Sequence, residues 1–411
     1  MFKRSEQSRY RERLDKSLAS AELQDQETVE ALVRNQLQCN SDSEGFSDMM
    51  VARRTTEVSN ILNLLRSVST QNYTSKQSEW KLKEEKEEYR VMYRPGPEGS
   101  PLHSLLVDGF VDSPLDHCLC VTWESALYDK WWPQFSVPPF KVTRNEVLQK
   151  LRIGENLSLV RMKLPWPLSS REAVLHFFLF EYVKEDLILV VFNSISESDD
   201  YSESTDGFTK DCIPEVKDVV RIGVQGCSVL QKVSAVRTYS RTIANVDTKM
   251  NFFPPSLVNF LSRSVIAKGF KLFQKIASSV SKNDKHFSKA LMDPIYKRIR
   301  SSLYEQITKG DANPELQSNV FQEGGKQIVV AHEHSSGACL NGNAELEGSS
   351  MENEIEDELF HDANNNGFAL LQSSSSSEIE EVEEDNHGVP KIESNGRHTV
   401  VARLQENTTS A

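Results

Sequence analysis

Few residues in this chain are of types that bind a metal or act as nucleophiles, and their spacing argues against catalysis. The run His332-Glu333-His334 offers two imidazoles and a carboxylate, but no third ligand follows at a spacing typical of a zinc site. Cys118 and Cys120 fall in an expected helix, where residues two apart point in different directions. The chain contains no Gly-rich phosphate-binding loop and no nucleophile-elbow motif. We therefore predict no metal, no cofactor and no catalytic residue.

The net charge of −13 conceals an uneven distribution of charged residues. Residues 311–411 carry 20 acidic and 4 basic side chains, whereas residues 1–310 carry 40 acidic and 43 basic ones. Within that nearly neutral part, residues 261–310 hold 11 basic and 3 acidic side chains, which predicts a basic face for an anionic membrane or another polyanion. Aromatic residues of this segment are not interleaved with the basic ones, so we expect no nucleic-acid partner.

The first residues and the cysteines indicate the compartment. MFKRSEQSRYRERLDKS has no apolar core of a secretory signal, and the six cysteines show no paired spacing, so we expect a reducing compartment. No apolar run reaches the roughly 18–20 residues that a transmembrane helix needs. These features predict a cytoplasmic protein that meets membranes from outside, as a peripheral protein.

Hydrophobic periodicity divides the chain into five parts. Helical stripes are expected near 27–38 and 48–67, and strands alternate with turns from Trp80 to Asp247. This order of elements favours an α+β fold with antiparallel strands. The expected parts are a helical arm at 1–45, a helix and linker at 46–77, a strand-rich domain at 78–283, a basic helix at 284–310, and an acidic disordered tail at 311–411.

The segment Pro254–Ser279, PPSLVNFLSRSVIAKGFKLFQKIASS, predicts an amphipathic helix. Its apolar side chains span about half of the helix circumference at 100° per residue. Arg263, Lys271 and Lys275 fall on the opposite arc. An ordinary core-packing helix would explain this pattern, and so would a helix that closes an apolar site.

Four segments in order resemble the START domain, the lipid-transfer module of the steroidogenic acute regulatory protein family. They are VDSPLD with LYDKWWPQF, LPWPLSSREAVLHFFLF, DVVRIGV, and FFPPSLVNFLSRSVIAKGFKLF. The resemblance covers residues 80–280, about half of the chain. The chain looks most like plant members that have a helical arm before the domain and an acidic tail after it.

The resemblance implies a helix-grip fold, in which a curved antiparallel sheet wraps a C-terminal helix around an apolar tunnel for one lipid. The helix at 255–280 would close the tunnel. The expected lipid-binding residues are Arg161, Phe178, Leu230, Val258, Leu261, Val265, Phe273 and Ile276. The expected membrane-docking residues are Arg263, Lys268, Lys271 and Lys275.

The implied function is the binding and transfer of a single lipid between membranes. One alternative is a lipid-gated regulatory or scaffold protein without transfer activity. Another is an enzyme, because related folds include cyclases and hydrolases, and an unpaired, strongly buried His176 would be its sign.

Two positions depart from the sterol-carrying members that this sequence resembles. Those members bury a Glu–Arg pair in the tunnel, where this chain has Ser158 and Phe177. A sterol held by a buried charge pair is therefore not expected. Arg161 alternates with apolar neighbours, so it would point inward toward a phosphate or extend to the surface.

The acidic segment ENEIEDELFHDANN, residues 352–365, resembles the FFAT motif, which binds VAP proteins of the endoplasmic reticulum. Five acidic residues precede Phe360, and Phe360, Asp362 and Ala363 match the motif, whereas His361 stands where a second Phe is usual. The resemblance implies a VAP partner and endoplasmic reticulum contact sites; an acidic linker is the alternative. The Ser373–Ser377 run is typical of a phosphorylation cluster or a solvated spacer.

Overall fold

The computed structural model describes residues 6–39, 47–68, 80–97, 100–166, 168–195, 208–214, 217–250, 255–280 and 284–304. All of them belong to one compact unit. The acidic tail, with its predicted disorder, its FFAT-like motif, the serine run and the HisGluHis run, lies outside the described residues. None of the described helices is both long enough and apolar enough to span a bilayer.

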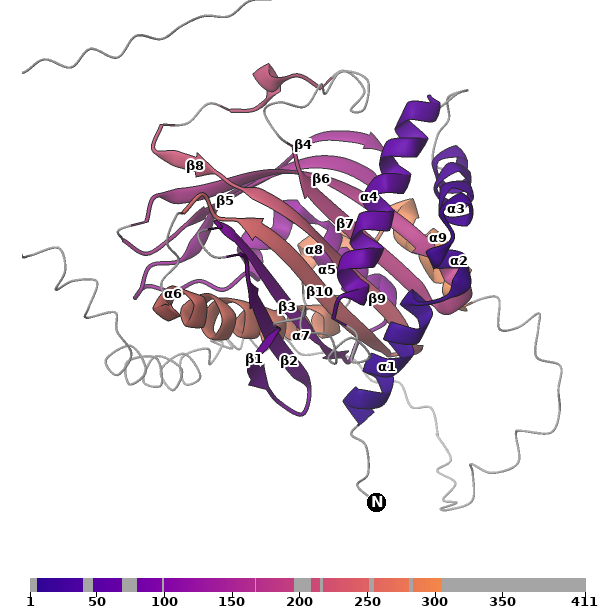
Figure 1. Ribbon diagram of the computed structural model, residues 1–411, viewed down its shortest axis with the longest axis horizontal. Helices are drawn as coiled ribbons and strands as arrows, with labels where there is room; N and C mark the ends of the chain where they lie inside the picture. The colour runs from indigo at the N-terminus through magenta and orange to yellow at the C-terminus, as the bar shows by residue number, and fades with distance from the viewer. Residues whose placement is uncertain are drawn as a thin grey trace, which may run out of the picture. The chain divides into compact units, whose positions relative to one another are not determined.

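Four helices come first in the chain, and the sheet and the remaining helices follow (Figure 1). The first helices are α1 Glu6–Leu18, α2 Ala21–Gln24, α3 Gln26–Cys39 and α4 Asp48–Arg66. The strands are β1 Lys81–Glu85, β2 Tyr89–Pro95, β3 Leu102–Val111, β4 Lys141–Arg152, β5 Glu155–Lys163, β6 Ser170–Tyr182, β7 Leu187–Ser194, β8 Val219–Arg221, β9 Gly223–Ser234 and β10 Arg237–Asp247. The later helices and the short turns of helix are α5 Leu115–Trp123, η2 Ser125–Lys130, η3 Val183–Glu185, η4 Lys210–Cys212, α6 Pro255–Asn259, η5 Phe260–Ala267, α7 Lys268–Ser279, α8 Lys285–Ala290 and α9 Pro294–Tyr304.

The strands form one curved sheet in the order β1-β2-β3-β10-β9-β7-β6-β5-β4, and every pair in this order is antiparallel (Figure 1). The short strand β8 adds a parallel pairing to the start of β6. The predicted fold class, an α+β helix-grip fold with a curved antiparallel sheet around C-terminal helices, is confirmed. The edge strand β1 has the sequence KLKEE, which has almost no apolar residues and no clear alternation, so periodicity alone does not predict its bounds.

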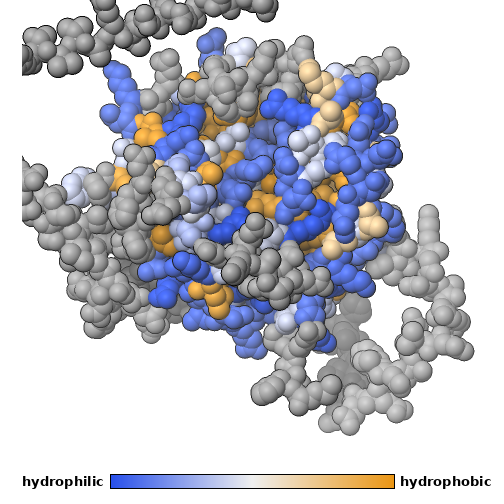
Figure 2. All heavy atoms as spheres, in the orientation of Figure 1, coloured by the Kyte–Doolittle hydropathy of each residue, from blue (hydrophilic) through white to orange (hydrophobic). Residues whose placement is uncertain are grey.

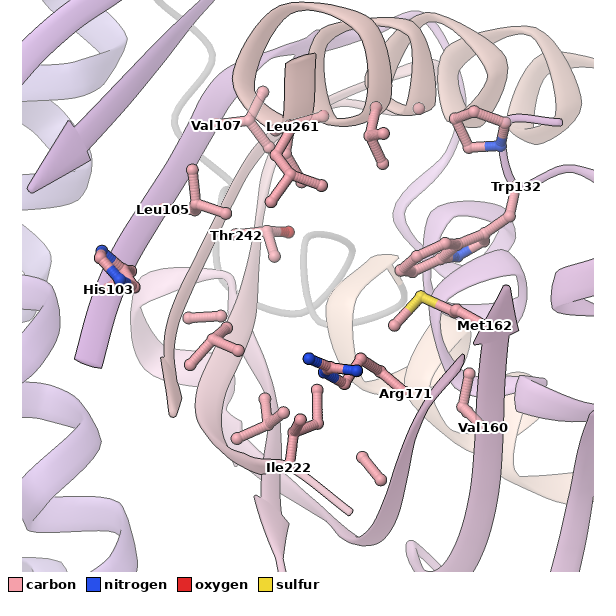
Figure 3. A pocket seen from close by; sticks show the side chains of 18 of the residues that line it. His103, Leu105, Val107, Trp132, Val160, Met162, Arg171, Ile222, Thr242 and Leu261 are labelled. Carbon is pink, nitrogen blue, oxygen red and sulfur yellow. The ribbon is translucent and has the colours of Figure 1, made fainter. Parts of the chain in front are cut away.

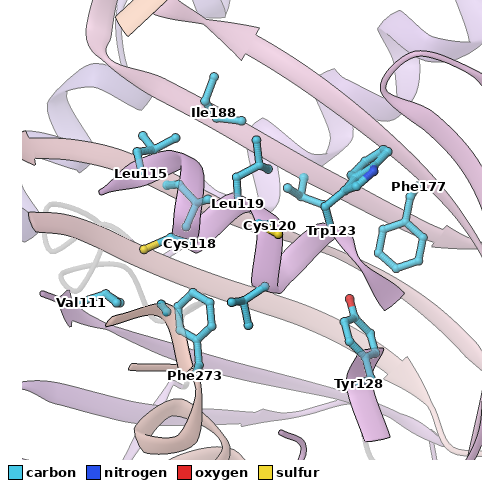
Figure 4. Packing of buried hydrophobic residues seen from close by; sticks show 14 of the residues in the cluster. Val111, Leu115, Cys118, Leu119, Cys120, Trp123, Tyr128, Phe177, Ile188 and Phe273 are labelled. Carbon is cyan, nitrogen blue, oxygen red and sulfur yellow. The ribbon is translucent and has the colours of Figure 1, made fainter. Parts of the chain in front are cut away.

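The inner face of the sheet packs against α5 and the C-terminal helices. Figure 4 shows α5 with Leu115, Leu119 and Trp123 among Ile188, Phe177 and Phe273 from the sheet and α7. Two buried cysteines of α5 belong to this cluster. Burial raises the pKa of the Cys118 thiol to about 12, so it stays protonated and unreactive.

The outer face of the sheet is covered by the helical arm. Helices α1, α3 and α4 contribute a row of buried aliphatic side chains, among them Leu14, Val33 and Leu62. They pack against outward-pointing residues of β6, β7, β9 and β10, which include Phe178, Phe180, Leu189, Val229 and Tyr239. The surface that remains visible over this side is largely hydrophilic, with hydrophobic residues only in small patches (Figure 2). The arm is therefore part of the hydrophobic core of the domain.

A buried ionic cluster joins α1 to the middle of the sheet. Asp108 accepts two 2.8 Å hydrogen bonds from Arg90 and one of 3.1 Å from Arg241, and neither Asp108 nor Arg241 is exposed. Arg241 donates in turn to Asp15 of α1 at 2.6 Å. Burial acts against the charged form of Asp108, but Arg90 and Arg241 outweigh it and lower its pKa to about 2.

A second buried cluster joins α4 to β5 and β6. Glu155 accepts a 2.8 Å hydrogen bond from the Nε of Arg54 and lies 2.6 Å from the Nε2 of His176. Arg152 also pairs with Glu155, and Arg54 pairs with Glu57 on its own helix. These paired charges fix the register of α4 on the sheet.

The basic region after residue 284 differs from its prediction, because it holds two helices and not one. Asp293 accepts a hydrogen bond from the backbone N–H of Ile295 at 3.0 Å, as an N-terminal cap does. Pro294 then occupies the first position of α9, where a missing N–H costs nothing. The Asp-Pro pair was the signal for this break. Arg300 and Arg298 of α9 pair with Asp116 and Glu181, so part of the predicted basic surface is neutralised.

We predict that Arg54→Ala destabilises the protein by about 3–5 kcal/mol, because it leaves the buried Glu155 without its main counter-ion. Arg53→Ala is the matched control on the same helix: Arg53 is about one-third exposed, and its pair with Glu57 is worth about 1 kcal/mol or less. Urea unfolding followed by circular dichroism measures both. Equal losses in the two variants would contradict a structural role for the Arg54–Glu155 pair.

We also predict that stability falls as the pH drops below about 6.5, the pKa of an unfolded histidine. Burial and the nearby Arg54 lower the pKa of His176 in the folded protein, so the unfolded chain takes up a proton that the folded chain refuses. His176→Gln keeps a donor for Glu155 and removes this titration. The free energy of unfolding between pH 7.5 and 5 should therefore fall less steeply in the variant, and parallel profiles would refute the prediction.

Candidate functional site

The segment predicted as one amphipathic helix forms three successive helical parts, α6, η5 and α7. Its C-terminal part is fixed to the domain: Gln274 donates to the carbonyl of Phe110 at 2.7 Å, and Ser113 donates to the carbonyl of Ala277 at 2.8 Å. Its middle part, η5, is a π-helix, and such wider turns are frequently found at functional sites. Phe260 of η5 packs against Phe135 and Phe140, with ring centroids 5.8 and 6.2 Å away.

A cavity of about 340 Å³ lies between this helix and the inner face of the sheet, within the size range of small-molecule sites. Its walls come from β2, β3, β5, β6, β7, β9 and β10, from α5 and the residues after it, and from α6, η5 and α7. Figure 3 shows Leu105, Val107, Val160 and Ile222 from the sheet directed into it, with Leu261 and Trp132 on the other sides. The lining is overwhelmingly apolar, so the cavity suits the hydrocarbon part of a ligand.

The few polar groups of the lining are mostly satisfied by one another. The hydroxyl of Tyr93 lies 2.8 Å from the Nδ1 of His103, and the hydroxyls of Ser228 and Thr242 are 2.8 Å apart. Arg171 is the charged residue of the lining among the described residues, and its guanidinium projects into the cavity (Figure 3). Sequence reasoning placed Arg171 in the family-like motif but gave it no role in the site.

Half of the predicted lipid-binding residues line this cavity: Val258, Leu261, Val265 and Phe273. Leu230 and Ile276 face the same side of the molecule but belong to the core around α5 and α7. Phe177 and Ser158, the positions where the sterol-carrying relatives have charges, lie on the inner face. Phe177 lines the cavity, and Ser158 accepts a 2.8 Å hydrogen bond from Ser125.

Phe178 and Arg161 do not line the cavity and must be corrected. On β6 the inward positions are Arg171, Ala173, Leu175 and Phe177, so Phe178 points outward into the cluster beneath the arm. Arg161 also lies on the outer face, where its Nε donates to Glu172 at 2.9 Å. It neither points toward a ligand nor extends to the surface, because a carboxylate on the adjacent strand is its partner.

The predicted membrane-docking residues lie on the side of the helix away from the cavity. Arg263, Lys271 and Lys275 are exposed, and Lys268 is partly buried, with its ammonium 4.7 Å from the ring centroid of Phe135. Burial lowers the pKa of Lys83 on β1, and the nearby charges of Lys81 and Arg263 lower it further. A basic patch therefore borders the helix at its N-terminal half.

His176, the residue that would have indicated an enzyme, is buried on the outer face and paired with Glu155. It is separated from the cavity by the sheet. Among the described residues, no group of three or more His, Cys, Asp or Glu side chains could hold a metal ion. His176 is therefore not the unpaired buried histidine that the enzyme alternative predicted.

Comparisons with known proteins return START-domain structures, as the sequence resemblance predicted. The chain is similar to human StAR-related lipid transfer protein 5, with 17% identity and a TM-score of 0.43 over 58% of this chain and 100% of that one. It is similar to human STARD10, with 17% identity and a TM-score of 0.41 over 56% and 87%. It is also similar to a fragment of a STAR-related lipid transfer protein from Xanthomonas axonopodis, with 21% identity and a TM-score of 0.35 over 48% and 98%. No family model and no curated protein matches the chain.

Proposed function

We propose that this protein binds one amphipathic lipid in the cavity beneath α6, η5 and α7 and transfers it between membranes. The observation that carries the proposal is an apolar cavity of about 340 Å³ inside the curved sheet, closed by an amphipathic helix. A cavity of this size is rare in a well-packed interior, and its apolar lining matches hydrocarbon better than water. The resemblance of four sequence segments to lipid-transfer domains supports the same class of ligand.

The surroundings of the helix support docking on a membrane. Trp166 and Val137 are 66% and 71% exposed, and they lie in loops whose neighbours, Leu164, Leu168, Phe135 and Phe140, pack together with α6 and η5. Exposed aromatic and aliphatic residues beside basic ones suit a membrane interface. Each Lys or Arg near an anionic surface contributes about 1 kcal/mol. We therefore propose a peripheral, cytoplasmic protein that opens its helix at the bilayer.

We predict that Ala173→Trp reduces lipid binding and transfer by at least about tenfold, because the indole fills cavity space on the inner face of β6. Protein purified from eukaryotic cells is analysed by native mass spectrometry, and transfer is measured between donor and acceptor liposomes. Wild-type protein should carry one lipid per chain. Binding without transfer would instead favour a lipid-gated regulatory protein.

The matched control for this prediction is Val236→Trp, which adds the same side chain at a position 68% exposed in the turn between β9 and β10. It should bind and transfer lipid like the wild type. Ala244→Trp, at a second cavity position on β10, covers the case in which the first variant does not fold. Undiminished lipid binding by folded Ala173→Trp and Ala244→Trp variants would exclude this cavity as the site.

We propose separately that the tail binds a VAP-type partner at endoplasmic reticulum contact sites. It rests on the sequence of residues 352–365, in which Phe360, Asp362 and Ala363 follow an acidic tract. We predict that Phe360→Ala abolishes capture of the full chain by an immobilised VAP domain, whereas Phe368→Ala, outside the motif, leaves it intact. Equal capture of both variants would show that the acidic charge alone is recognised.

A further inference from the structure

The charge balance around Arg171 is incomplete. Its side chain is 7% exposed, and two of its five N–H groups have protein partners: Nη1 donates to the carbonyl of Ser169 at 2.7 Å and Nε to that of Thr248 at 3.4 Å. Both partners are neutral backbone carbonyls. The guanidinium thus has no acidic partner among the described residues.

The acidic residue nearest in sequence is not available to Arg171. Glu172 points to the opposite face of β6, where it accepts hydrogen bonds from Arg161 and, at 2.7 Å, from Arg221. No Asp or Glu belongs to the lining of the cavity among the described residues. The other buried arginines described above, Arg54, Arg90 and Arg241, each donate to a buried carboxylate, whereas Arg171 donates only to backbone carbonyls.

The surroundings of Arg171 make this unbalanced charge costly. Figure 3 shows its guanidinium between Ile222 on one side and Met162 and Trp132 on the other. An uncompensated charge in such an environment is unfavourable, and a ligand that brings the opposite charge removes this cost. Burial also lowers the pKa of Arg171, although arginine keeps its proton. Its backbone is held by pairing with Met162 of β5 and Val220 of β8, so the guanidinium is a positioned group and not a mobile one.

We propose that Arg171 binds the oxyanion of an amphiphile whose chain occupies the cavity, with a phosphate or carboxylate as headgroup. This inference rests on the proposed lipid-binding function and narrows it to anionic lipids. A guanidinium fork forms two parallel hydrogen bonds with either oxyanion, and Nη2 with the second N–H of Nη1 is the edge left for it. Neutral lipids with the same acyl chain would leave the charge of Arg171 without a counter-ion.

Two probes that differ only in the phosphate test the inference: 1-oleoyl lysophosphatidate and 1-oleoylglycerol, each titrated calorimetrically below its micelle concentration into the full chain. The wild type should bind the phosphate-bearing probe about tenfold or more tightly. Arg171→Gln should reduce its affinity to that of the neutral probe and leave neutral binding unchanged. Arg221→Gln is the matched control, because Arg221 is an arginine of the neighbouring strand that pairs with Glu172 on the outer face, and it should behave like the wild type.

The outcomes separate this inference from the proposed function. If neither probe binds the wild type, the lipid-binding function itself fails. If the wild type binds both probes equally, or Arg171→Gln keeps the preference, only the role of Arg171 fails. A titration with inorganic phosphate tests whether the ligand is a free anion and not a lipid. If phosphate binds as tightly as lysophosphatidate, and this binding depends on Arg171, the lipid assignment is overturned.

Discussion

The architecture follows from one constraint: the central strands of the sheet are apolar on both faces, so both faces must be covered. Strand β6 shows this most clearly: eight of its thirteen residues are apolar or aromatic, and Arg171, Glu172 and His176 are buried as well. The arm covers the outer face over β6, β7, β9 and β10, and a smaller cluster with Ile195 and Phe208 covers part of β5 and β6. On the inner face, α5 and the C-terminal helices form the main core, and the cavity lies between the sheet and α6, η5 and α7.

The two halves of the closing helix are held in different ways. Helix α7 inserts Phe270, Phe273 and Ala277 into the main core and is tied to β3 by a hydrogen bond. The segment α6–η5 instead packs in a smaller cluster with loop residues such as Phe135 and Leu164. The π-helical turns of η5 lie between the part of the segment that packs in this smaller cluster and the part that packs in the main core. A segment with fewer core contacts on one side of an irregular turn is the part that opens at the lowest cost in free energy.

Much of the fold was predictable from periodicity, because long alternating strands and an amphipathic helix are strong local signals. Periodicity failed where both faces of a strand are apolar. In Phe177-Phe178 nothing in the residue types tells which ring faces inward, and an error of one residue moves every side chain to the other face. Arg161 and Arg171 posed the same difficulty, since only the cross-strand position of Glu172 decides which arginine is neutralised. The packing of the arm on the sheet could not be read from local sequence at all, because it depends on pairs such as Arg54 and Glu155, 101 residues apart.

The arm also has a mechanical effect. Helices α1 and α4 are joined to three strands, through the pairs Arg11–Asp108, Asp15–Arg241 and Arg54–Glu155 with β3, β10 and β5, so the arm stiffens the outer side of the sheet. We therefore expect this side of the sheet to move little. The lipid exchange proposed above would then depend on the opposite wall, which α6, η5 and α7 form.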